Sequence, residues 1–135
     1  MVYGDEKLEG TGIFCYVAPG NDDMFEVDDL IRSSRHIWLA EGNVVQLDDH
    51  HEMISSGWTN PTPWHTFREE SEDKLLARME TMIAKVKDVH PCIFDLYVPP
   101  FDSSLDVVPK ALSWNARARI GKRLRWYEEV HEVRR

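Results

Sequence analysis

Two short and nearly continuous apolar runs constrain the fold of this chain most. They occupy residues 11–17 and 91–98, and each stops abruptly at turn-forming residues. Runs without polar alternation are typical of strands in a sheet that is covered on both faces. Residues 71–86 lie between them and place a single apolar stripe on a helix, formed by Leu75, Leu76, Met79, Met82, Ile83 and Val86. Strands that alternate with helices predict an α/β (α+β) fold.

Shorter elements fill the space between the two runs. Asp22 or Asp23 can cap a helix whose apolar residues recur at helical spacing, namely Met24, Val27, Leu30 and Ile31. An extended segment at residues 37–39 and a hairpin over residues 44–55 are expected next. The loop at residues 57–67 carries two prolines and three large aromatic residues. Ordered loops of this length usually serve function or pack over a site.

The length and charge distribution predict one domain followed by a C-terminal segment of opposite charge. The 135 residues carry a net charge of −8, which argues against nucleic acid and membrane surfaces as partners. Residues 110–135 hold eight basic and three acidic residues, a net charge of +5 against −13 for the rest. We therefore expect a domain over residues 1–110 and a basic, helical tail over residues 111–135.

The expected compartment is the cytoplasm. No apolar run approaches the roughly 18 residues that a membrane span needs, and the first residues lack a signal-peptide pattern. Cys15 and Cys92 each lie inside an apolar run. They are expected to be buried free thiols.

The segment Gly20-Asn21-Asp22-Asp23 is the main candidate for chemistry. It follows the first apolar run directly and offers an amide oxygen and two carboxylates, a set suited to a divalent cation or a phosphate-bound metal. The alternative is an ordinary turn that caps a helix. Because the carboxyl ends of parallel strands share one edge, this loop and the loop at residues 97–106 are expected to lie together.

Three Asp-x-His triplets form a second group of candidates, at residues 48–50, 49–51 and 88–90. On a strand this spacing puts both side chains on one face, where they could share a metal ion. Their positions in the hairpin turn and before a strand place them at the opposite end of the sheet. They are therefore expected to be solvated surface groups.

Four segments resemble the calcineurin-like metallophosphoesterases, most closely a small prokaryotic branch. They are residues 16–23, 56–64, 68–70 and 93–106, which match in order and spacing within a resemblance that covers residues 10–111. The resemblance implies a partial metallophosphoesterase-type β-sandwich flanked by helices. It also implies hydrolysis of a phosphoester substrate with two divalent metal ions that clamp the phosphate and activate a water.

The resemblance also assigns roles to individual residues. Asn21 matches the family's asparagine metal ligand, and Asp23 matches the acid that follows it beside the metal. Asp22 stands where many members carry a catalytic histidine and could orient a water. Tyr97 occupies the position of a histidine ligand at a strand end, so it marks a lost ligand. The family's Asp-x-His, Gly-Asp-x-x-Asp and Gly-His-x-His segments have no counterpart in the expected places.

Two functions follow from this pattern. The first is a truncated or diverged phosphoester hydrolase that is inactive alone, because most of its metal ligands are missing. The alternative is a non-catalytic interaction module that exposes an unpaired sheet edge and pairs through it, for example as a homo-oligomer.

Overall fold

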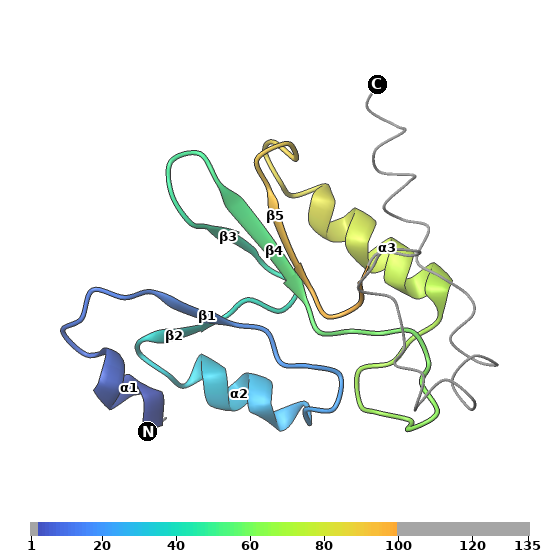
Figure 1. Ribbon diagram of the computed structural model, residues 1–135, viewed down its shortest axis with the longest axis horizontal. Helices are drawn as coiled ribbons and strands as arrows, with labels where there is room; N and C mark the ends of the chain where they lie inside the picture. The colour runs from blue at the N-terminus through green and yellow to red at the C-terminus, as the bar shows by residue number, and fades with distance from the viewer. Residues whose placement is uncertain (1–2, 100–135) are drawn as a thin grey trace, which may run out of the picture.

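A computed structural model describes residues 3–99 of the chain (Figure 1). Three helices and five strands occur in this part of the chain. In order they are α1 (Tyr3–Leu8), β1 (Cys15–Val17), α2 (Glu26–Arg32), β2 (Ile37–Leu39), β3 (Val44–Gln46), β4 (Glu52–Ser56), α3 (Glu72–Ile83) and β5 (Ile93–Leu96). The fold is thus a small mixed α/β arrangement, as expected from the alternation of strands and helices. Residues 111–135, the expected tail, lie outside the described residues.

The strands form two small sheets. Strands β1 and β2 pair in parallel, whereas β4 pairs antiparallel with β3 and parallel with β5. A single parallel bridge between Glu41 and Ser55 links the chain just after β2 to β4. Strands β1, β2, β4 and β5 therefore run in the same direction, so their carboxyl ends lie at one edge of the structure.

The main core lies between α3 and the β3-β4-β5 sheet, where Figure 1 shows the helix running alongside β5. It contains Ile54 of β4 and the apolar stripe of the helix, namely Leu75, Met79, Met82, Ile83 and the following Val86. Helix α3 begins directly after Ser71, as predicted, and its periodicity is confirmed. Helix α2 packs against β2 on the other side of the molecule (Figure 1).

Helix α1 was not anticipated, and a buried carboxylate holds it in place. Asp5 accepts hydrogen bonds from the Ser34 hydroxyl and from the backbone N–H groups of Arg35 and His36, both at 3.1 Å. The Ser34 hydrogen bond, partly opposed by burial, lowers the pKa of Asp5. This contact fixes α1 to the chain that enters β2.

The first apolar run forms a shorter strand than predicted. Only residues 15–17 pair, and Gly12 has a φ of +71° that interrupts the extended backbone before them. Ile13 and Phe14 are 60% and 70% exposed, so the expected cover on both faces is wrong here. The second run is also shorter, since β5 spans four residues.

The structure also bears on the predicted hairpin, the two cysteines and membrane spans. The hairpin is confirmed as β3 and β4, with Gln46 opposite Glu52 next to the turn. Cys15 and Cys92 are free thiols as expected, but both are only partly buried. Among the helices of residues 3–99, none is long and apolar enough to cross a membrane.

Candidate functional site

The loops that follow the parallel strands meet in what we call the strand-end rim, made of residues 19–21, 41, 56–57 and 97. A Cβ atom added to Gly20 would lie 2.9 Å from the Tyr97 ring, and one added to Gly57 would lie 1.7 Å from the Pro19 carbonyl oxygen. The Tyr97 N–H also donates to the Ser56 carbonyl at 2.9 Å. The expectation that the Asn21 loop and the loop at residues 97–106 share one edge is confirmed for its start at Tyr97, whereas residues 100–106 lie outside the described residues.

Asn21 is fixed by the loop at residues 57–67. Its side-chain N–H donates to the Thr66 hydroxyl at 3.0 Å, and its backbone carbonyl accepts from the Arg68 N–H at 3.0 Å. The side-chain oxygen accepts no hydrogen bond from the residues that the structure describes. Asn21 therefore presents one amide oxygen that is available to a ligand.

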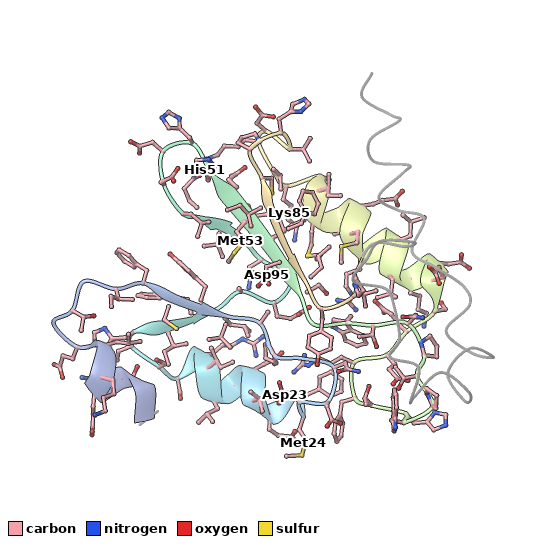
Figure 2. All side chains as sticks on the ribbon, viewed as in Figure 1. Asp23, Met24, His51, Met53, Lys85 and Asp95 are labelled. Carbon is pink, nitrogen blue, oxygen red and sulfur yellow. The ribbon has the colours of Figure 1, made fainter. Side chains whose placement is uncertain are left out.

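Asp22 and Asp23 behave differently from a helix cap. Both are exposed, and α2 begins at Glu26 with Phe25 at the N-cap position, so the expected cap by either aspartate is wrong. The Asp23 carboxylate instead accepts from the Gly20 N–H at 2.8 Å and closes the turn. Figure 2 shows Asp23 beside the start of α2, apart from Asp95 on the β3-β4-β5 sheet.

Glu41 is a rim residue that the sequence analysis missed. Its carboxylate accepts from the Gly57 N–H at 2.6 Å and from the Ser56 hydroxyl at 3.4 Å. Burial raises the pKa of Glu41, although these hydrogen bonds and the positive charges of Arg78 and Arg68 oppose the shift. Its place two residues after a short predicted strand is the one feature of the sequence that could have drawn attention to it.

Arg68 and Glu69, which directly follow the loop at residues 57–67, fix its conformation. Arg68 is 1% exposed, pairs with Asp28 at 2.6 Å and stacks on the Phe25 ring at 5.0 Å. Burial disfavours the ionised form of Glu69, but hydrogen bonds from Thr62 and Thr66 together outweigh it and lower the pKa to about 2. The loop is therefore an ordered element that packs against the Asn21 turn.

A second pair of contacts anchors the two ends of this loop to α3. Arg78 donates to the Glu70 carboxylate through two nitrogens, at 2.6 and 3.2 Å. The same guanidinium lies 4.2 Å from the centre of the Trp58 ring. The tip of the loop points outward, since Trp64 is 67% exposed and Phe67 is 50% exposed.

The Asp-x-His triplets lie at the opposite end of the sheet, as expected. The hairpin turn and the chain after α3 line a hollow of about 710 Å³, to which Asp48, His50, Lys87 and Asp88 contribute. The N–H groups of His50 and His51 and the ring of His51 bind the Asp48 carboxylate and lower its pKa to about 2. Figure 2 shows His51 at the tip of the hairpin, far from Asp23.

The donor set for a metal ion is small in the described part of the chain. Within residues 3–99 there is no group of three or more His, Cys, Asp or Glu side chains that could hold one. The side-chain oxygens at the strand-end rim belong to Asn21, Glu41, Ser56 and Tyr97, and the exposed Asp22 lies next to it. The Glu41 carboxylate already accepts hydrogen bonds from Gly57 and Ser56, and Tyr97 is 59% exposed. The rim brings together the positions of interest but not a ligand cage.

Comparisons with protein-family models, with curated proteins and with solved structures found no match to this chain.

The close contact at Gly57 leads to a stability prediction. Gly57→Ala is expected to destabilise the fold by about 3 kcal/mol, because its methyl group would collide with the Pro19 backbone. Gly20→Ala is the matched control and should cost about 1 kcal/mol, because the exposed Tyr97 ring can rotate away. Urea unfolding measures both, and equal effects would contradict the backbone contact.

The partly buried carboxylate of Glu41 leads to a pH prediction. Because its pKa in the fold is raised, the stability that Glu41 contributes is present below the unfolded pKa and is lost as the pH rises through the folded pKa. Glu41→Gln cannot ionise and should therefore gain stability relative to the natural chain between about pH 4 and about pH 8. Urea unfolding at both pH values tests this, with Glu80→Gln on the exposed face of α3 as the control. A stability difference that does not change with pH would refute the role given to Glu41.

Proposed function

We propose that this chain is built on the calcineurin-like metallophosphoesterase scaffold, with its two sheets and flanking helices as part of a β-sandwich. The observation that supports this is the contact between Gly20 and Tyr97 at the strand-end rim. It brings next to each other the two loops in which the resemblance locates an asparagine ligand and a former histidine ligand. A phosphoester is the ligand class that this scaffold would take at the rim.

Those rim residues that the structure describes do not fit a pair of divalent metal ions. Such a pair needs several oxygen and nitrogen ligands to clamp a phosphate and to activate a water. Asn21 offers one oxygen, whereas the carboxylates of Asp23 and Glu41 already accept hydrogen bonds from the N–H groups of Gly20 and Gly57. A tyrosine phenol is a poor replacement for histidine at Tyr97. We therefore propose that the chain does not hydrolyse phosphoesters by itself.

A titration of manganese into the purified chain tests this proposal. The chain should bind Mn²⁺ no more tightly than about 1 mM, because one amide oxygen and an exposed aspartate make a weak site. Asn21→Ala should bind equally weakly, and neither protein should release nitrophenol from bis(p-nitrophenyl) phosphate. Micromolar binding that disappears in Asn21→Ala would show that the chain completes a metal centre, and the proposal of inactivity would then be wrong.

A pair of histidines tests the proposed geometry of the rim. Asn21→His combined with Tyr97→His should bind Zn²⁺ roughly tenfold more tightly than either single variant, because both rings would then reach one ion. Tyr97→His alone should gain little, since it adds one ligand where several are missing. Zinc calorimetry against the natural chain corrects for binding by the six natural histidines. A double variant no better than the single ones would show that the two positions do not face a common ligand.

A further inference from the structure

Strand β1 has a free outer edge among the residues that the structure describes. In the two-stranded sheet, β2 pairs with one side of β1, and no other strand of residues 3–99 pairs with its second side. An unpaired edge presents backbone N–H and C=O groups that another strand can bind. Natural proteins usually protect such edges with charged residues or proline. Residues 10–18 contain neither.

The sheet next to this edge also carries an uncovered aromatic face. The register places Tyr16 opposite Trp38, so both side chains lie on the same face. The Trp38 ring centre lies 5.8 Å from that of Tyr16 and 5.7 Å from that of Phe14. Phe14 is 70% exposed and Trp38 is 41% exposed. The three rings therefore form a continuous apolar surface, which we call the aromatic face.

The opposite face of the same sheet is the one that the helices cover. Residues adjacent in a strand point to opposite faces, so Ile37 and Leu39 lie on the side away from Trp38. Helix α1 contacts Ile37, whose Cδ1 atom would lie 2.7 Å from a Cβ added to Gly4. Helix α2 contacts β2 and buries Ile31. The helices therefore cover one face of the β1-β2 sheet, and the aromatic face on the other side is exposed.

We propose that a second copy of this chain pairs antiparallel with the β1 edge, so that the aromatic faces of the two copies join. A two-fold axis brings identical edges together antiparallel, which lets the same N–H and C=O groups satisfy each other. Two copies of a chain with a net charge of −8 repel each other over most of their surface. Residues 10–19 contain no Asp, Glu, Lys, Arg or His, so this segment carries no charge. The edge is therefore a place where two copies can approach without like charges opposing them. This inference does not rest on the phosphoesterase proposal.

The expected dimer is a weak one. The paired edge is only three residues long, and a large aromatic side chain buries at most about 150–250 Å². The contact is therefore smaller than the roughly 800 Å² per partner of a standard stable interface. Dissociation in the micromolar range is expected, so the population of dimer should depend on concentration.

Sedimentation velocity of the full 135-residue chain tests the proposal. The natural chain should move from monomer at about 1 µM to mostly dimer at about 200 µM. Phe14→Lys places a charge directly beside the β1 edge, where the two copies would meet, and should remain monomeric at the higher concentration. Trp64→Lys places the same charge on an aromatic residue of similar exposure in the loop at residues 57–67 and should dimerise like the natural chain. A natural chain that is monomeric throughout, or a dimer equally affected or unaffected by both changes, would overturn the proposal.

Hydrogen exchange of the natural chain decides the matter even if Phe14→Lys fails to fold. Amides of residues 13–17 that face away from β2 should exchange more slowly at the higher concentration, because the second copy would then bind them. Exchange at these residues that does not change between the two concentrations would refute pairing through β1. A dimer whose protection appears only elsewhere would likewise refute it.

Discussion

The contact between Gly57 and the Pro19 backbone is the constraint on which the arrangement of the strand-end rim depends. No side chain fits between these residues, since an added Cβ would lie 1.7 Å from the Pro19 oxygen. The Glu41 carboxylate holds the Gly57 N–H from the other side. The turn after β4 is therefore clamped between the chain after β1 and the chain after β2, and the positions of Gly20 and Tyr97 follow from it.

A buried ion pair between Arg68 and Asp28 fixes the loop at residues 57–67 to the rest of the structure. Arg68 and Asp28 are 1% and 14% exposed, and removing one partner of such a pair costs about 3–5 kcal/mol because the other charge is left buried. The Arg68 backbone binds the Asn21 carbonyl, so the same residue connects α2, the long loop and the Asn21 turn. The Nε atom of Arg68 has no partner among the described residues, so the guanidinium is held mainly by Asp28 and the Phe25 ring.

The sequence predicted those parts whose signal is local. The periodicity from Leu75 onward located α3, and the hairpin turn located β3 and β4 within a residue or two. It did not predict the exposure of Phe14, because an apolar run has the same composition whether or not another element covers it. It also missed Glu41, whose function as a hydrogen-bond acceptor depends on Gly57, sixteen residues later. At the rim, the contact between the Asn21 loop and the chain at Tyr97 could be predicted from the direction of the strands. The hydrogen bond from the Gly20 N–H to the Asp23 carboxylate could not, because it depends on the geometry of the turn.

The rim shows that the position of a site and its chemistry have separate physical origins. The position is set by backbone contacts, namely the approach of Gly57 to the Pro19 carbonyl and the hydrogen bond from the Tyr97 N–H to the Ser56 carbonyl. The chemistry is set by side chains such as Tyr97, which is 59% exposed and can change without disturbing those contacts. A scaffold of this kind can therefore lose ligands one at a time and keep its loops in place. Phe14 beside the β1 edge is a second example, since its exposed ring can change without disturbing the core of residues 3–99.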